Sequence, residues 1–440
     1  MSSCPPRVLF ELVAAALEAL APERLVDRAL RVEGRRLFVA GQALELGGVG
    51  TVHVFGAGKA AAAMAAGVEA VLGDCAPCGF VIVNDGNSVP TRRVEVREAA
   101  HPVVDARSLE ATRELVARLE RVEEDDLALF LLSGGASALL ELPVAGLGLG
   151  DLQHTNEVLL RVGADIRETN SIRKRLSAVK GGRLGQRLAG RRLVSLVVSD
   201  VVGAPLDVIG SGPTVGDTST FADAWRVVAT YALRDRLPSR VLEHLQRGRD
   251  GLVAETPRPD DAAFAHHLAR IIADNQTGTD ALARAARRAG YDARPWGSYL
   301  EGEAREVGVR LGRAALELPV GACVIAGGET TVTVRGSGRG GRNQELALGA
   351  AQALAGTADT WVLAFATDGI DGPTGAAGAL VNGELVEQAR AAGLDVDAAL
   401  RDNDAYPLLD RLGALVRTGP TQTNATDLCV LLRGAGDVAC

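Results

Sequence analysis

Positive charge in this chain is carried almost entirely by arginine, so the few lysines stand out. The 440 residues include 47 basic side chains, of which only Lys59, Lys174 and Lys180 are lysine. An ammonium group is a compact point charge with three donors, which suits a phosphate oxygen. All three lysines lie in glycine-rich or polar segments. The pattern favours phosphate or another small anion as a ligand, although a composition-biased chain can also keep a few lysines by chance.

The first glycine-rich segment is Gly56-Ala57-Gly58-Lys59-Ala60, between an apolar run and a helical one. Glycines here would let the backbone approach an anion, and a helix N-terminus would offer N–H groups. The spacing also fits the dinucleotide fingerprint G-x-G-x-x-A, with Asn84-Asp85 placed where a ribose-binding acid could lie. Lys59 is more natural beside a phosphate or carboxylate. A plain strand–helix turn is the structural alternative.

The second glycine-rich segment runs from Ser133 through Gly134 and Gly135 to Ser137. Its backbone N–H groups could form a nest for phosphate oxygens, with the serine hydroxyls as further donors. It is neither a Walker A loop nor a G-x-S-x-G nucleophile elbow. The expected helix over 169–180 places Lys180 before a Gly-Gly stop, where it could line an anion site or simply favour the helix dipole.

Carboxylates follow two apolar runs in the same way. Asp200 ends Val198-Ser199-Asp200, and Asp368 follows Thr367 after the run 361–366. An aspartate at the end of a parallel strand can hold Mg²⁺ or accept a proton. A solvated turn is the alternative, and it is the stronger interpretation for the nearby Asp217 and Asp371.

The richest cationic segment is 335–345, in which four glycines alternate with three arginines before a helix opens at Arg342. Arginine forks bind carboxylate or phosphate through two parallel hydrogen bonds. A solvated hairpin explains Arg335 and Arg339, but it explains Arg342-Asn343 poorly. The polar loop 419–427 precedes a last apolar strand and could either close over a site or form a simple turn.

Alternating strands and helices must position these segments. Short β-branched runs predict strands at 52–55, 79–83, 127–132, 193–199, 323–326, 330–335, 361–366 and 428–432. Helical stretches lie between them, at 60–72, 108–121, 280–289 and 342–355. Buried strands followed by helices indicate parallel α/β sheets, whose ligands bind at the carboxyl ends of the strands. The polar segment 247–261 is the best linker, giving domains at 1–246 and 262–440.

The composition of the chain argues against several classes of protein. The chain is 47% hydrophobic and 23% charged, which is enough apolar material for large cores and excludes disorder. The net charge of −8 argues against nucleic acid or an anionic membrane as a partner. The N-terminus resembles neither a signal peptide nor a spanning helix, so a cytoplasmic location is expected. Cys75 and Cys78 have C-x-x-C spacing, but no further zinc ligands stand close by.

Taken together, the motifs resemble glycerate 2-kinases of the MOFRL-domain type, some members of which have carried the label hydroxypyruvate reductase. The resembling stretches, in order, are GAGKA at 56–60, HPVVDARS at 101–108, LLSGGASALLELP at 131–143, TNSIRKRLSAVKGGRL at 169–184, VVSDVVGAPLDVIGSGPTVGD at 197–217, GGETTVTV at 327–334, GRGGRNQELAL at 338–348, FATDGIDGPTGAAGA at 365–379 and TGPTQTNATDL at 418–428. They cover nearly the whole chain.

The resemblance implies a Rossmann-like N-terminal α/β domain and a smaller MOFRL-type α/β domain, with the active site in the cleft between them. It implies transfer of the ATP γ-phosphoryl group to the C2 hydroxyl of D-glycerate, with Mg²⁺ or another divalent cation. A homodimer is compatible with it. Lys59 and Arg342 match the lysine and arginine that the family places in the cleft.

The candidate site combines the residue patterns with this resemblance. The expected catalytic residues are Lys59, Arg342, Asp200 and Asp368, the two aspartates also serving as metal ligands. The expected substrate and phosphate contacts are Gly56, Gly58, Ser133, Gly134, Gly135, Ser137, Arg175, Lys180, Glu329, Asn343 and Asn424.

Two other function classes stay open at this point. An NAD(P)-dependent hydroxypyruvate reductase would use the G-x-G-x-x-A turn, but it leaves Arg342 and Asp368 with little to do. A nucleotide-binding regulatory module would not need charged motifs in both domains.

Overall fold

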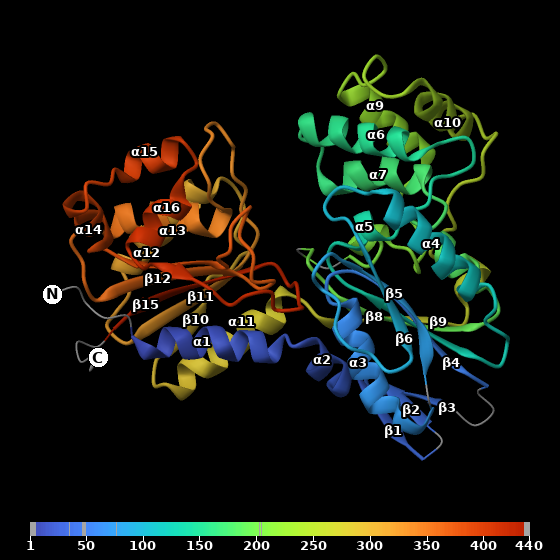
Figure 1. Ribbon diagram of the computed structural model, residues 1–440, viewed down its shortest axis with the longest axis horizontal. Helices are drawn as coiled ribbons and strands as arrows, with labels where there is room; N and C mark the ends of the chain where they lie inside the picture. Colours follow the sequence, from blue (N-terminus) through green and yellow to red (C-terminus); the bar gives the residue numbers. More distant parts are fainter. Residues whose placement is uncertain are drawn as a thin grey trace. The chain divides into compact units, whose positions relative to one another are not determined.

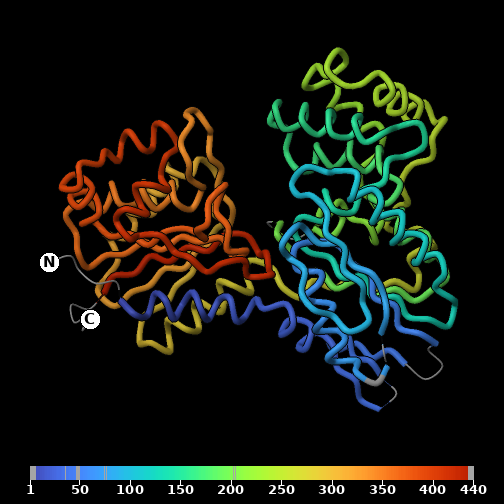
Figure 2. The backbone as a smooth tube through the Cα atoms, in the orientation of Figure 1, coloured from blue at the N-terminus to red at the C-terminus, as the bar shows by residue number. Residues whose placement is uncertain are grey.

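The computed structural model describes residues 6–434, except 35, 46–49, 76, 202 and 204. It divides into two compact units, one formed by Pro22–Ile272 and the other by Met1–Ala21 with Ala273–Cys440. In Figures 1 and 2 the second unit combines the blue N-terminal helix α1 with the yellow, orange and red C-terminal part. We call them the 22–272 unit and the C-terminal unit.

The 22–272 unit is built on a six-stranded sheet with the order β6-β5-β4-β7-β8-β9. Strands β6 to β8 are mutually parallel, as their pairings show. The central strand β7 consists of six buried residues, as expected for a sheet covered on both faces. The strands are β4 (Val52–Ala57), β5 (Cys78–Asn84), β6 (Val94–Ala99), β7 (Leu127–Leu132), β8 (Arg192–Val198) and β9 (His267–Ala273).

Helices of this unit fall into two groups. Those beside the sheet are α3 (Ala61–Leu72), α4 (Ala106–Leu119), α5 (Ala136–Leu139) and α8 (Arg183–Gln186), and α2 (Pro22–Ala29) packs on α3. The others pack on one another around a separate apolar cluster, and they are α6 (Leu149–Arg161), α7 (Ile166–Leu176), α9 (Phe221–Thr230) and α10 (Ser239–Arg249). A small antiparallel sheet completes the unit, with β1 (Leu30–Glu33), β2 (Arg36–Val39) and β3 (Gln42–Glu45).

The sheet of the C-terminal unit is mixed, with the order β10-β11-β15-β12-β13-β14. Its strands are β10 (Asp292–Pro295), β11 (Ala322–Gly328), β12 (Thr360–Ala366), β13 (Gly378–Asn382), β14 (Leu415–Val416) and β15 (Asp427–Arg433). Strand β15 runs antiparallel to both β11 and β12. The expectation of a parallel sheet is therefore wrong for this unit, because the last strand of the chain inserts between two strands that run the other way.

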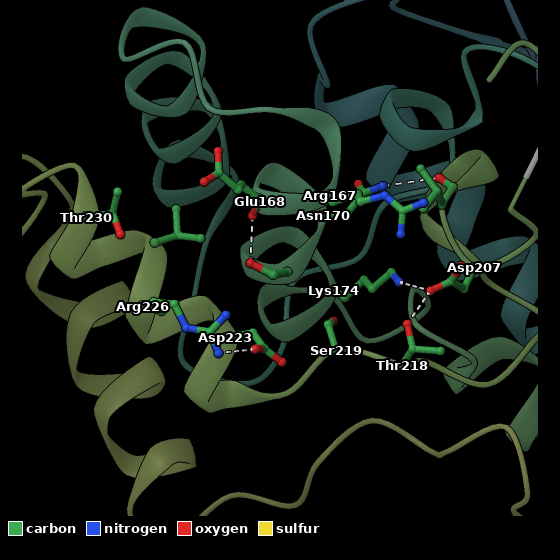
Figure 3. A pocket seen from close by; sticks show the side chains of 13 residues that line it. Arg167, Glu168, Asn170, Lys174, Asp207, Thr218, Ser219, Asp223, Arg226 and Thr230 are labelled. Atoms are coloured by element: carbon green, nitrogen blue, oxygen red, sulfur yellow. Dashed lines mark hydrogen bonds and ion pairs between the residues drawn. The ribbon is translucent and has the colours of Figure 1, made fainter. Parts of the chain in front are cut away.

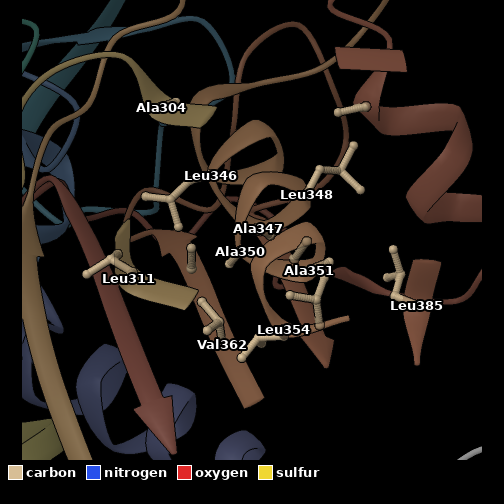
Figure 4. Packing of buried hydrophobic residues seen from close by; sticks show 14 of the residues in the cluster. Ala304, Leu311, Leu346, Ala347, Leu348, Ala350, Ala351, Leu354, Val362 and Leu385 are labelled. Carbon is tan, nitrogen blue, oxygen red and sulfur yellow. The ribbon is translucent and has the colours of Figure 1, made fainter. Parts of the chain in front are cut away.

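The helices of this unit are α1 (Arg7–Ala19), α11 (Asn275–Arg288), α12 (Ala304–Leu316), α13 (Arg342–Leu354), α14 (Leu385–Ala391), α15 (Val396–Arg401) and α16 (Ala405–Arg411). Helix α13 carries much of the core. Its Leu346, Ala350 and Leu354 belong to the same buried cluster as Val362 of β12 (Figure 4). This packing fixes the N-terminus of α13, where Arg342 lies.

Two local predictions differ from the structure. Residues 330–335 form no strand, because side chains take their backbone groups: Glu303 accepts from the Thr333 N–H, and Asn403 accepts from Arg335 and Gly336. The expected linker 247–261 packs into the 22–272 unit, and the chain crosses between units at 21–22 and 272–273 instead. Within the described residues, no helix is long and apolar enough to span a membrane.

Candidate active site

Three of the predicted residues follow three neighbouring parallel strands. Lys59 comes just after β4, Ser133 directly after β7, and Asp200 just after β8. Because parallel strands end at the same edge of a sheet, these residues lie along one edge. The strand order also reverses at β4. From β4 the chain adds β5 and β6 on one side of the sheet and then returns to add β7 and β8 on the other side. Ligands of open α/β sheets bind at such a reversal.

The turn at Lys59 is locked to the turn after β7. The Lys59 N–H donates to the Gly134 carbonyl at 2.8 Å, and the Ala60 N–H donates to Ser133 Oγ at 2.9 Å. Gly58 has φ +129°, and a Cβ there would lie 2.2 Å from Ser133 Oγ. Only glycine fits this position. Ser133 thus ties the start of α3 to β7, a structural task that its predicted phosphate contact did not anticipate.

Gly56 is explained by strand packing. A Cβ at Gly56 would lie 2.5 Å from the carbonyl oxygen of Leu131 in the adjacent strand β7. The glycine therefore permits β4 and β7 to approach each other, and an anion is not needed to explain it.

Lys59 and His101 flank the second glycine turn. Gly135 has φ +86°, and a Cβ there would lie 3.1 Å from His101 Cδ2 and 3.4 Å from Lys59 Cγ. The lysine stem and the imidazole thus lie over the bare backbone of Gly135. His101 belongs to the HPVVDARS stretch, but its residue type and spacing alone gave no reason to place it here.

Two predicted anion contacts are buried ion pairs. Arg175 is fully buried and binds Asp217 at 2.6 Å, and Asp217 also binds Lys174 at 2.9 Å. Burial alone would raise the pKa of Asp217, but the two cations lower it well below its usual range. Lys180 is fully buried against Glu141, and burial lowers the pKa of its ammonium. Both Arg175 and Lys180 already have carboxylate partners, which favours structural roles.

Lys174 and Asn170 of α7 line a pocket of about 350 Å³ that faces α9 (Figure 3). Lys174 also reaches Asp207 at 3.5 Å, and Asp207 accepts from the Thr218 hydroxyl at 2.8 Å. Asp207 thus balances part of the charge of Lys174 in this pocket.

Arg342 is the centre of the predicted site in the C-terminal unit. Its Nε and Nη2 donate to the two oxygens of Asp427 at 2.5 and 2.9 Å, and its Nη1 lies 2.7 Å from Glu329. Glu329 follows β11 and Asp427 begins β15, so adjacent antiparallel strands bring them to one edge. Burial raises the pKa of Asp427 and alone would lower that of Arg342, whose pKa Asp427 and Glu329 raise.

Asp427 was missed by the sequence reasoning. It ends the polar loop 419–427 and begins β15. Because β15 runs antiparallel to β12, its start lies at the same edge of the sheet as the end of β12, which Asp368 follows.

A second buried carboxylate caps the helix that carries Arg342. Asp371 accepts hydrogen bonds from the N–H groups of Asn343 at 3.1 Å and Gln344 at 2.9 Å. A Cβ at Gly341 would lie 2.3 Å from Asp371 Cγ, so glycine is required there. Burial, with Asp427 nearby, raises the pKa of Asp371 to about 6. Asn343 is buried beside this cap, which favours a structural role over its predicted ligand contact.

Asp368 and the loop 419–427 meet at the end of β12. The Thr421 N–H donates to the Asp368 carbonyl at 3.2 Å, and Thr367 Oγ1 donates to the Thr426 carbonyl at 2.7 Å. Asn424 Oδ1 accepts from the Thr426 N–H at 3.4 Å. Hydrogen bonds therefore hold the loop 419–427 against the end of β12, beside Asp368.

Metal ligands do not form a ready-made cage. In the part of the chain that the structure describes, no group of three histidine, cysteine, aspartate or glutamate side chains could hold a metal ion. The two aspartates predicted as metal ligands, Asp200 and Asp368, lie in different units. Each aspartate could therefore supply only one carboxylate to a cation, and the rest of a Mg²⁺ shell would have to come from phosphate oxygens and water.

Two family models match the chain: Domain of unknown function (DUF4147) over residues 8–246 and the MOFRL family over residues 322–427. A glycerate 2-kinase of Pyrococcus horikoshii is 39% identical, and the match covers 96% of each chain. The chain belongs to the MOFRL-type glycerate kinase family.

A solved structure agrees with this family. The glycerate kinase of Thermotoga maritima superimposes with a TM-score of 0.83 at 37% identity, covering 97% of this chain and 99% of the other. An Agrobacterium vitis protein provisionally named a hydroxypyruvate reductase is 41% identical over 88% of each chain. The glycerate kinase family therefore includes members that carry the reductase name, as the resemblance implied.

Proposed function

We propose that the protein transfers the γ-phosphoryl group of ATP to the C2 hydroxyl of D-glycerate, giving 2-phosphoglycerate and ADP. The identity to a glycerate 2-kinase carries the proposal, and each unit adds a cation beside a position that requires glycine: Lys59 beside Gly58 and Arg342 beside Gly341. Phosphoryl transfer needs positioning and neutralisation of charge more than covalent help from the protein.

The residues divide the work by charge. Lys59 would neutralise phosphate or carboxylate oxygens, and so would Arg342, which is paired with Asp427 and Glu329 but, unlike Arg175 and Lys180, has a side chain that is 32% exposed. The turn at 133–135 would hold phosphate through its backbone. Asp200 or Asp368 would hold Mg²⁺ or accept the proton of the attacking hydroxyl. Bound Mg²⁺–ATP supplies the electrophilic phosphorus and part of the charge neutralisation. That both units contribute residues to one site is implied by the family resemblance and stays a prediction.

Reductase chemistry is not favoured by the local geometry. The acid that could bind a ribose, Asp85, is held by both Nη atoms of Arg107 at 2.6 and 2.9 Å. A dinucleotide site would need this carboxylate for the hydroxyl of the ribose.

Two parallel incubations test the proposal. One contains D-glycerate, ATP and Mg²⁺ and is followed by ADP release, and the other contains hydroxypyruvate and NADH and is followed by NADH loss. We expect ADP release that depends on glycerate, and no NADH loss. NADH loss without ADP release would replace the kinase by the reductase, and neither change would support a binding module. The cytoplasmic location and the homodimer likewise stay predictions.

A further inference from the structure

A chain of hydrogen bonds leads from the protein interior to the second glycine turn. Ser137, in α5, lies 2.9 Å from Ser211 Oγ, and Ser211 Oγ lies 2.9 Å from Asn170 Oδ1 in α7. Ser211 and Asn170 are buried, whereas Ser137 is half-buried. Ser137 is therefore the outer end of this chain, beside Gly135 and its neighbour Lys59.

The direction of the chain is fixed at its inner end. The amide nitrogen Nδ2 of Asn170 donates to the Val208 carbonyl at 3.1 Å, so its Oδ1 faces Ser211 as an acceptor. A serine hydroxyl has one proton and two lone pairs. Since Ser211 gives its proton to Asn170, it can only accept from Ser137. Ser137 therefore donates its hydroxyl proton to Ser211, and the lone pairs of its oxygen face outward.

The backbone at Ser211 indicates that this side chain has a task. Ser211 has φ +63°, between Gly210 at +57° and Gly212 at +58°. The backbone on both sides is pinned, because Gly181 donates to the Ser211 carbonyl at 2.9 Å and Gly182 to the Gly212 carbonyl at 2.7 Å. A non-glycine residue in this region costs free energy, and such strain gathers at functional sites. Glycine would relieve the strain but would lack the hydroxyl.

We propose that Ser137 acts as a hydrogen-bond acceptor toward substrate and that Asn170 and Ser211 are the positioning residues that set this polarity. The inference rests on the proposed kinase function and revises the role expected of Ser137. Phosphate and carboxylate oxygens are acceptors, so they cannot pair with its lone pairs. Ser137 instead receives a substrate hydroxyl that does not react, either the C3 hydroxyl of glycerate or a ribose hydroxyl of ATP.

Three variants and a control test the inference by calorimetric binding and by kinetics. S137A removes the acceptor, S211G removes the relay while suiting the left-handed backbone, and the double variant combines them. S195A is the matched control. Buried Ser195 also forms a hydrogen bond to a hydroxyl, that of Thr214, at 2.9 Å, but it takes no part in the hydrogen bonds that link Asn170, Ser211 and Ser137.

We expect S137A and S211G each to weaken one substrate about tenfold in Kd and KM, with little change in kcat. The double variant should lose no more than S137A alone, and S195A should bind as wild type. The ligand that lacks the accepted hydroxyl should bind all these proteins equally. D-lactate plays that part for the C3 hydroxyl, and 2′-deoxy-ATP or 3′-deoxy-ATP for a ribose hydroxyl.

Three results would overturn the inference: normal binding by S137A, normal binding by S211G, or an equal loss with hydroxylated and deoxy ligands. The last would mean that Ser137 donates to an anionic group after all. Failure of the kinase function itself is distinguishable, since a wild type that binds glycerate and ATP without turnover would refute the reaction and leave the calorimetric comparison readable. A wild type that binds neither ligand would refute both.

Discussion

Lys59 is the residue on which the account depends most directly. K59A should lower kcat/KM for glycerate phosphorylation about 100-fold or more, because a fixed positive charge beside the transferred phosphoryl group is lost. K59R should also be poor, since a planar fork does not reproduce a compact ammonium in this tight turn.

Steady-state kinetics and thermal melting, measured together, decide this case. The turn is held by backbone bonds and by Ser133, so the melting temperature should change little in either variant. Near-normal turnover, or loss of stability with activity retained, would show that Lys59 only completes a structural turn.

The two strand-end aspartates carry the metal prediction. D200N and D368N are nearly isosteric, and at least one should raise the Mg²⁺ concentration needed for half-maximal rate about tenfold or more. D85N is a matched control, because Asp85 follows β5 but is bound by Arg107. If both variants kept the wild-type Mg²⁺ dependence and rate, neither aspartate would hold the metal.

Asp371 should make stability depend on pH in an unusual direction. Its pKa in the native state is about 6, against 3.8 for an ordinary aspartate. Between these values the native protein keeps a proton that the unfolded chain has lost, so this contribution falls as pH rises from about 4 to about 6 and is constant above. The free energy of unfolding of wild type relative to D371N should fall by up to about 3 kcal/mol over that window.

Urea unfolding of both proteins at pH 4, 5, 6 and 7 measures this difference. The side-chain amide introduced by D371N can still accept one of the two N–H groups at the start of α13, so the variant should fold. A difference that stays constant, or that grows as the pH rises, would contradict the raised pKa.

Only some residues of the candidate site could be predicted from the sequence. Lys59 and Arg342 stood out because rare lysines and glycine-flanked arginines are visible locally. Asp427 did not, because its partner Arg342 lies 85 residues earlier and only the antiparallel insertion of β15 brings them together. Burial could not be predicted either. The sequence of 169–182 does not distinguish a lysine that faces a ligand, as expected of Lys180, from a lysine that is paired with Glu141 inside the protein.

Helix α7 shows how an element can be held by a buried charge cluster. Lys174 and Arg175 both bind Asp217, which also accepts from the Thr256 hydroxyl at 2.8 Å. D217N would leave two buried cations without their shared carboxylate, and we expect a loss of about 3–5 kcal/mol in the free energy of unfolding. The effect on kcat should be small if the folded fraction is corrected for.

Glu255 offers the matched control for that experiment. It binds Arg175 at 3.1 Å, but its side chain is 40% exposed, so E255Q should cost well under half as much as D217N. Denaturant unfolding of the two variants gives the comparison. A D217N protein as stable as wild type would show that the cluster does not stabilise α7, and equal losses would show that burial of the Asp217 carboxylate does not increase its contribution.

At the level of elements, the sequence predicted which segments are strands and helices better than how they run. Strand β7 matches its predicted range, and α3 and α13 each differ from theirs by one residue at one end, because their apolar patterns are strong. The predicted parallel direction of the strands was wrong for the C-terminal sheet. The apolar run that forms β15 does not show between which strands it will insert.

For the whole molecule, the division of the chain was the hardest feature to predict. Residues 247–261 have the composition of a linker, yet Thr256 and Glu255 in this segment complete the Asp217 cluster. The N-terminal helix α1 belongs with the C-terminal unit, although the whole 22–272 unit separates them in sequence. Composition reports polarity, whereas membership of a unit depends on contacts between distant segments.

The central claim for the whole molecule is a phosphoryl transfer to one particular hydroxyl, and identifying the product by ³¹P NMR tests it most directly. The protein is incubated with D-glycerate, ATP and Mg²⁺, and the spectrum is compared with those of 2- and 3-phosphoglycerate standards. We expect 2-phosphoglycerate to appear in an amount equal to that of ADP. This expectation would be contradicted by 3-phosphoglycerate as the product, or by unchanged ATP from a protein that oxidises NADH with hydroxypyruvate.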